Sequence, residues 1–327
     1  MEWLYMGWLG TPVWFWLAFI GIVGVLTAFD LGVLNRRDHE IGIKESLLLS
    51  AFYISIALLF GAWVWAEKGP DLGVKYYTGF VIEKALSIDN VFVISLIFSY
   101  FAIPRMYQYR ALVWGIIAVI VLRGIMIGVG AAVVEQFHWV LYIFGGFLIL
   151  TGVKMLFSGE SEADIGANPV VRFLSKHLRV SKEMDGHHFL VKVPHEKTGK
   201  MVMAMTPLLL ALIVINIADL VFAVDSVPAI FAITTDTFVV YTSNIMAILG
   251  LRALYFALSA MIHRFQYLSY ALGLVLIFIG GKIFVADFLL DGDKFPPALS
   301  LGITLALILG GVLVSLWKTK DEATIPA

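Results

Sequence analysis

The chain has 327 residues, of which 60% are hydrophobic and only 14% are charged, and its formal net charge is -1. Soluble domains carry about 25% charged residues, so this composition argues against a water-soluble globular protein. The balanced charge and the lack of a basic arm argue against nucleic-acid binding. Cysteine is absent, which excludes a disulfide framework, a thiolate metal site and a thiol redox pair within these residues.

Apolar stretches of about 20 residues recur along the chain, and a helix needs about that length to cross a bilayer. They predict an all-α polytopic membrane protein, with 1–327 forming a single transmembrane transporter domain. We expect about nine transmembrane helices, over 12–34, 46–66, 76–101, 108–134, 137–157, 204–234, 237–261, 266–289 and 297–317.

The connections differ in charge. Most Lys and Arg residues outside the apolar stretches fall in the first, third, fifth and seventh connections and in the tail. The positive-inside rule therefore predicts that these segments are cytoplasmic, with the N-terminus outside and the C-terminus inside. The one long connection, 158–203, is then a cytoplasmic loop. Its stretches from Phe189 to Val193 and from Met201 to Met205 predict a β-hairpin.

Two of the apolar stretches carry acidic motifs. One contains Glu83 and, six residues later, Asp89-Asn90. The other contains Asp219 and, six residues later, Asp225-Ser226. Ionisable residues inside membrane helices are costly and mark functional sites by default, so both motifs are candidates for an ion site.

The two motifs belong to longer units of three predicted helices each, the third to fifth and the sixth to eighth. Each unit has an acid-x5-Asp motif, then an Arg, then a Gly-x-Lys motif. Because each unit has an odd number of helices, the two units must point in opposite directions. An inverted repeat of this kind places transporter sites near the membrane midplane at the repeat interface. The matched pairs are Glu83 with Asp219, Asp89 with Asp225, Arg123 with Arg252, and Lys154 with Lys282.

The polar residues in the predicted helices offer oxygen ligands, with no Cys and no His among them. Such a set suits hard divalent cations such as manganese, magnesium or calcium better than zinc or copper. The main metal-ligand candidates are Asp89, Asp225, Glu83, Asp219, Asn90 and Ser226. Possible auxiliary residues are Asp30, Asn216, Asn244 and Lys84.

Two geometries of the site remain open. Residues six apart in a helix lie about 120° apart and about 9 Å along the axis, so Glu83 and Asp89 share an ion only if the helix bends. In the second motif, Pro228 would disturb the carbonyl group of Val224 and make it a possible ligand. Alternatively, Asp89 and Asp225 meet across the repeat axis, with the first acid of each motif serving as an entry or proton site.

The basic residues of the repeat could instead neutralise these acids and fix helix packing. We expect that structural role for Arg123, Arg252, Lys154 and Lys282. Lys84 could tether an acid of either repeat.

The motifs Glu83-Lys84-Ala85-Leu86-Ser87-Ile88-Asp89-Asn90 and Asp219-Leu220-Val221-Phe222-Ala223-Val224-Asp225-Ser226 resemble those of the TerC family, and the resemblance extends over nearly the whole chain. The family consists of multi-pass bacterial inner-membrane proteins, first associated with tellurite-resistance loci. Within it, the chain is most similar to the manganese exporter branch that responds to pH and manganese. The resemblance implies manganese efflux, with the motif acids in the ion pathway.

Residues and resemblance together predict a divalent cation exporter of the bacterial cytoplasmic membrane that works by alternating access. It is expected to be a transporter rather than an enzyme, with no cofactor, and with manganese, the lipid bilayer and counter-moving protons as its partners. Asp89 and Asp225 would form the core site with Asn90 and Ser226, while Glu83 and Asp219 would be auxiliary ligands or proton carriers. Two alternatives are a membrane scaffold of a tellurite- or stress-resistance assembly, and a calcium or sodium antiporter that uses the same acids.

Overall fold

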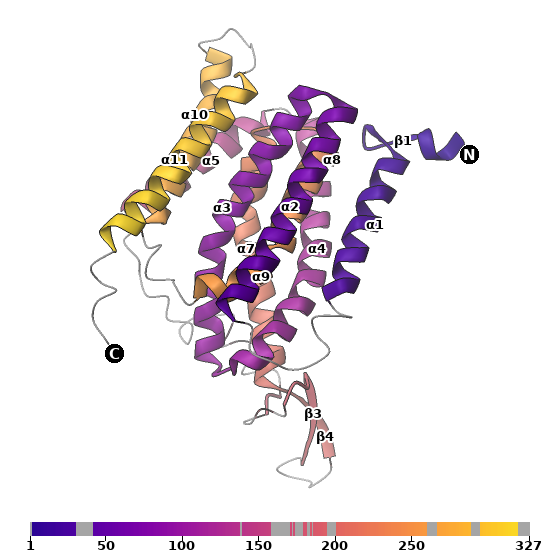
Figure 1. Cartoon of the computed structure of the whole chain (residues 1–327), viewed down its shortest axis with the longest axis vertical. Coiled ribbons are helices and arrows are strands. Elements are labelled where there is room, and N and C mark those ends of the chain that lie inside the picture. The colour runs from indigo at the N-terminus through magenta and orange to yellow at the C-terminus, as the bar shows by residue number, and fades with distance from the viewer. Residues whose placement is uncertain are drawn as a thin grey trace.

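The structure, a computed structural model, describes residues 2–30, 42–137, 139–157, 171, 173, 179–181, 184, 186–194, 201–259, 267–288 and 295–319. The side chains of Glu2, Asp89, Asp225 and Arg252 are not described. Most of the described chain is α-helical, and the helices form one bundle (Figure 1). The helices are α1 (Val13–Phe29), α2 (Ile43–Lys68), α3 (Pro70–Tyr100), α4 (Arg105–Gln136), α5 (Val140–Phe157), α7 (Pro207–Phe231), α8 (Thr237–Leu249), α9 (Leu251–Ser259), α10 (Leu268–Phe288) and α11 (Pro297–Lys318).

Several of these helices could cross a membrane. Six of the described helices are long and apolar enough, namely α2, α4, α5, α7, α10 and α11, and the bent pair α8–α9 makes a seventh if it is one span. The all-α polytopic fold is therefore confirmed. Helix α1 is shorter, with 17 residues, and α3 carries the first acidic motif among its 31 residues. The nine-span arrangement and the inverted repeat stay predictions.

Local sequence explains where several helices begin. Pro70, Pro207 and Pro297 occupy the first positions of α3, α7 and α11, where a missing N–H costs nothing. Asp236 caps α8, because its Oδ1 accepts a hydrogen bond from the Val239 N–H at 2.9 Å. Large apolar side chains such as Leu59 on α2 and Leu313 on α11 are exposed on the outside of the bundle, as expected of surfaces that face lipid.

One predicted span is broken. The segment 237–261 is expected to be a single helix, but the chain bends by 54° between α8 and α9, next to Gly250. A Cβ atom on Gly250 would lie 2.8 Å from Lys84 Nζ and 3.1 Å from Tyr53 Cβ. The bend is therefore at a point where side chains of α3 and α2 approach the α8–α9 backbone. By contrast, α7 continues through Pro228 to its end at Phe231.

Helices α5 and α10 approach each other closely through glycines, in an interface that we call the glycine seam. A Cβ atom on Gly145 would lie 3.2 Å from the carbonyl oxygen of Gly280, and one on Gly273 would lie 2.9 Å from that of Gly152. The two contacts make the helices antiparallel. Small residues allow such close approach, which favours helix association in membranes.

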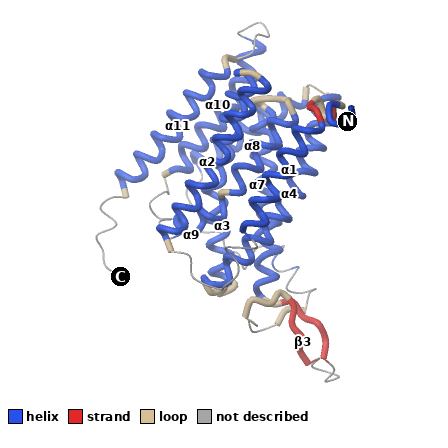
Figure 2. Tube along the Cα trace, turned by 45° about the vertical axis from the view of Figure 1, so that its right-hand side comes forward, coloured by secondary structure: helices blue, strands red, loops and turns tan. Residues whose placement is uncertain are grey.

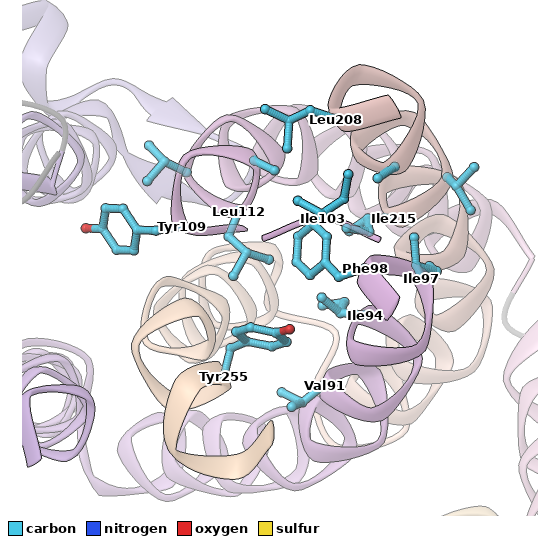
Figure 3. Packing of buried hydrophobic residues seen from close by; sticks show 14 of the residues in the cluster. Val91, Ile94, Ile97, Phe98, Ile103, Tyr109, Leu112, Leu208, Ile215 and Tyr255 are labelled. Carbon is cyan, nitrogen blue, oxygen red and sulfur yellow. The ribbon is translucent and has the colours of Figure 1, made fainter. Parts of the chain in front are cut away.

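The other principal packing pairs are α3 with α8 and α4 with α7. Apolar side chains from α3, α4, α7 and α9 fill one end of the bundle, and Figure 3 shows this cluster around Phe98, Leu112 and Tyr255. A second cluster, around Phe231 and Ile127, lies where α4, α7 and α8 meet toward the other end. The centres of α4 and α7 therefore lie between two apolar layers.

Two small sheets flank the helices. Near the N-terminus, the short 3-10 helix Glu2–Tyr5 precedes a pair of two-residue strands, β1 (Gly7–Trp8) and β2 (Thr11–Pro12). The hairpin predicted in the long loop is confirmed as β3 (Leu190–Pro194) paired antiparallel with β4 (Met201–Met205). It projects from the far end of the bundle (Figure 2). Most of the remaining loop lies outside the described residues.

Candidate functional site

Arg123 lies near the middle of α4, and its side chain is only 1% exposed. Its guanidinium group contacts polar side chains of three other helices. Nη1 donates hydrogen bonds to Glu83 Oε1 on α3, to Ser226 Oγ on α7 at 3.2 Å and to Asn244 Oδ1 on α8 at 3.0 Å. We call these residues, together with Asp219, the Arg123 cluster.

Asp219 faces the other side of the same guanidinium group. Nε donates to its Oδ2 and Nη2 to its Oδ1, both at 3.2 Å. This two-pronged arrangement matches the planar fork of Arg to the carboxylate and gives the pair a defined geometry. The Asp219 side chain is 12% exposed, so it is less enclosed than its partner.

Glu83 is fully buried at the centre of α3. Its Oε1 pairs with Arg123, and its Oε2 accepts a hydrogen bond from Asn244 Nδ2 at 2.9 Å. Asn244 therefore bridges the acid and the base, donating to one and accepting from the other. A buried unpaired carboxylate would cost several kcal/mol, so these partners stabilise the charged form of Glu83.

The cluster joins residues that the sequence places in different repeat units. Glu83 and Asp219 are the matched first acids of the two motifs, and a single arginine holds both. The expected neutralising role of Arg123 agrees with these ion pairs. Its position as the common partner of both acids is not evident in the sequence, because it depends on how α3, α4 and α7 pack. With both acids ionised, these three residues carry a formal charge of -1.

Asn216 lies one turn before Asp219 on the same face of α7. Its Nδ2 donates to the Leu212 carbonyl at 2.8 Å, while its buried Oδ1 has no hydrogen-bond partner among the described residues. An unpaired buried amide oxygen is unfavourable, so this atom is a candidate ligand next to the cluster.

The structure describes less of the second half of each motif, Asp89-Asn90 and Asp225-Ser226. Asp89 and Asp225 belong to α3 and α7, but their side chains lie outside the description, so their meeting across the repeat axis stays a prediction. Asn90 is buried on α3, 5% exposed, and makes no described contact with Arg123. Of the predicted small polar ligands, Ser226 joins the Arg123 cluster and Asn90 does not.

Two auxiliary candidates lie elsewhere. Asp30, at the end of α1, accepts a hydrogen bond from the Tyr53 hydroxyl group and is 1% exposed. Lys84 Nζ donates to the Ala247 carbonyl at 3.2 Å. It makes no described ion pair with Glu83 or Asp219, which both pair with Arg123 from α4. A tether from Lys84 to an acid of the motifs stays a prediction, because the side chains of Asp89 and Asp225 are not described.

No group of three His, Asp or Glu side chains close enough to hold a metal occurs among the described residues. The described residues do not include the side chains of Asp89 and Asp225.

Two cavities lie toward the end of the bundle where α7 ends, both next to Phe231. One, of about 400 Å³, is lined by Glu135 and Asp236, and the other, of about 290 Å³, by Lys75 and Lys282. Phe231 packs tightly here, because a Cβ atom on Gly130 would lie 2.8 Å from its ring.

These features define a helical membrane protein with a carboxylate–guanidinium cluster at the centre of its bundle. The chain belongs to the TerC family: the family model described as "Integral membrane protein TerC family" matches residues 68–323. The matched segment contains both acidic motifs and every residue of the Arg123 cluster.

Curated relatives cover almost the whole chain. An uncharacterized membrane protein of Myxococcus xanthus is 43% identical over 312 residues, which are 95% of each chain. Another, from Rickettsia bellii, is 44% identical over 300 residues, 92% of this chain and 96% of the relative. Alx of Escherichia coli K12 is 42% identical over 322 residues, 95% of this chain and 97% of the relative, and its provisional description is a membrane-bound redox modulator. No solved structure matches the chain.

Proposed function

We propose that this protein exports a divalent cation, with manganese as the cargo, through an intramembrane carboxylate site by alternating access. The observation that carries the proposal is the convergence of Glu83 and Asp219 with Ser226 and Asn244 at the centre of the bundle. Acids buried at that depth are costly unless a cation balances them, and a transported ion can supply part of that balance.

The chemistry of the cluster supports a hard cation. Its potential ligand atoms are carboxylate, hydroxyl and amide oxygens, and Asn216 Oδ1, which has no partner in the described part of the chain, lies one turn away. Manganese, magnesium and calcium prefer such oxygen ligands, whereas zinc and copper prefer nitrogen or sulfur. The TerC resemblance favours manganese within this class. A calcium or sodium antiporter with the same acids is the closest alternative.

The packing of α5 against α10 supports the inverted repeat. The repeat pairs Gly152 with Gly280 and, at the same offset, Gly145 with Gly273. A twofold axis would then exchange the contact between Gly145 and Gly280 with the contact between Gly273 and Gly152. Both contacts occur in the glycine seam. Nine membrane-spanning segments would follow, with α1 and α3 included and α8–α9 counted as one broken span.

The same arrangement gives the proposed orientation. The basic residues favour a cytoplasmic tail and long loop, with the N-terminus outside. The described relatives come from bacteria, which supports the cytoplasmic membrane as the location. Protons are the proposed counter-ion, because the carboxylates that release the metal can take up protons.

The redox description of Alx suggests a second candidate function for this chain. Thiol–disulfide exchange within these 327 residues is excluded, because none of them is a cysteine. A redox effect would have to act through the ion that it moves or through a partner. The scaffold alternative likewise places function in partners rather than in ion movement.

Reconstitution tests the proposal. Liposomes containing the purified chain should move Mn²⁺ across an imposed pH gradient, and an uncoupler should slow that flux. Asp89→Asn and Asp225→Asn should each abolish flux while the inserted protein stays near its normal amount, and the double variant should be no worse than either. Asp71→Asn, on α3 with a largely exposed side chain, is the matched control and should keep its flux. A wild-type chain that moves no Mn²⁺ would favour the scaffold.

A further inference from the structure

Arg123 holds more oxygen atoms than an ordinary ion pair needs. Its three nitrogens contact five oxygens, which are Glu83 Oε1, both carboxylate oxygens of Asp219, Ser226 Oγ and Asn244 Oδ1. Hard dications take about six oxygen ligands. One side chain has therefore gathered most of a cation coordination shell, drawn from three helices.

We infer that Arg123 is a built-in competitor of the transported cation, an inference that rests on the proposed function. The ion and the guanidinium group would use the same oxygen atoms, but at different distances. Metal–oxygen bonds of hard dications are about 2.0 to 2.6 Å long. The cluster's nitrogen–oxygen distances to Asp219, Ser226 and Asn244 are 3.0 to 3.2 Å, with N–H groups pointing at the oxygens. Both cations cannot occupy these oxygens together.

Charge explains what the competition achieves. When the guanidinium group pairs with the acids, it neutralises one of the two buried negative charges without a metal ion. A proton taken up by the carboxylates as counter-ion would neutralise the other for the return step. When the dication binds, Arg123 must withdraw and lose its partners. That loss weakens metal binding and helps the ion to leave, because a buried arginine without partners is unfavourable. Arg123 therefore sets the affinity of the site as well as its geometry.

A purely structural ion pair makes a different prediction. If Arg123 only fixes helix packing, its replacement lowers stability and does not tighten metal binding. If it competes with the cation, its replacement removes a rival for the same ligands. Each charge-assisted hydrogen bond to Arg123 stabilises the metal-free site. Without these bonds, the affinity of the site for the metal should rise on the order of tenfold or more.

The test measures Mn²⁺ affinity by titration of the purified full chain, and its melting temperature with and without MnCl₂. Arg123→Gln should bind Mn²⁺ about tenfold more tightly or better. It should melt at a lower temperature than wild type without the metal, and Mn²⁺ should restore more stability to it than to wild type. Its flux should fall, because release is slowed. Arg105→Gln, an exposed position on the same helix with the same loss of charge, should resemble wild type.

Arg123→Lys keeps the test decisive if Arg123→Gln does not fold. Lysine retains the positive charge but cannot donate the two-pronged pair to Asp219, so it should compete less. Its Mn²⁺ affinity should exceed that of wild type by several-fold. Unchanged or weaker binding in this variant would overturn the inference. If wild type moves Mn²⁺ but the Arg123 variants do not bind Mn²⁺ more tightly, the competition between Arg123 and the metal is ruled out and the proposed function stands. If wild type neither binds nor moves Mn²⁺, the proposed function fails first.

Discussion

Asn244 is the residue that closes the hydrogen-bond network of the cluster. Its amide group donates to Glu83 Oε2 and accepts from Arg123 Nη1, so each end of the amide satisfies a charged group. The residue is fully buried on α8. It therefore contacts both the acid and the base of the cluster.

Removing this amide should be costly. Asn244→Ala leaves one carboxylate oxygen and one guanidinium N–H with fewer partners, and we expect a loss of about 1 to 3 kcal/mol of stability. The adjacent Ser243 is an equally buried control, because its hydroxyl donates to the Val239 carbonyl of its own helix at 2.7 Å. Ser243→Ala should cost less than about 1 kcal/mol. Thermal unfolding in detergent compares the two, and equal losses would contradict the described network.

The candidate site was only partly predictable at this scale. Intramembrane acids are visible in a sequence because they interrupt apolar runs, so Glu83 and Asp219 stand out. The pairing of Arg123 with Asp219 is not visible in the sequence, since 96 residues separate them and only helix packing brings them together. Lys84 is the converse case: it adjoins Glu83 in sequence, but its ammonium group donates to Ala247.

Among the helices, α5 and α10 approach each other closely enough for glycine positions of one to face backbone carbonyl groups of the other. Helix positions were largely predictable, because the bilayer thickness sets the length of apolar segments. The break between α8 and α9 was not. It lies next to Gly250, where Lys84 and Tyr53 from two other helices approach the backbone too closely for a Cβ atom, and that approach is a matter of helix packing.

The glycine seam offers a matched pair of substitutions. A side chain at Gly145 would meet the Gly280 carbonyl and the Phe284 ring, 3.0 Å away, whereas one at Gly146 has no heavy atom within 4 Å. Gly145→Val should separate the helices and cost about 1 to 3 kcal/mol, as overpacking does. Gly146→Val should stay within about 0.5 kcal/mol of wild type. The measurement is the melting temperature of each variant in detergent. Similar values for Gly145→Val and Gly146→Val would mean that the seam is not close-packed.

At the scale of the whole molecule, the described N-terminal segment and the β3–β4 hairpin lie at opposite ends of the bundle (Figure 1). The proposed orientation puts the hairpin in the cytoplasm and the N-terminus outside. The apolar lengths alone leave the number of spans open, because α1 is short and α3 is polar. Orientation therefore needs a direct measurement.

The natural lack of cysteine makes that measurement simple. Ser161→Cys in the long loop and Thr324→Cys in the tail should react with a membrane-impermeant maleimide only from the cytoplasmic side. Asp291→Cys, between α10 and α11, should react only from the outside. The unsubstituted chain is the control and should take up no label. Outside labelling at position 324 would refute the nine-span topology and the inverted repeat with it.

The glycine seam also bears on the energetics of transport. In the proposed transport cycle, the short side chains of the seam would let α5 and α10 rotate against each other while staying in contact, so the two units of the predicted repeat would turn about this interface. With the twofold symmetry of that repeat, the interface would look the same from either side of the membrane. It would then contribute equally to the inward-facing and outward-facing forms. Any resting bias between the two forms would come from elements with no symmetry mate, such as α1, α2, α11 and the hairpin.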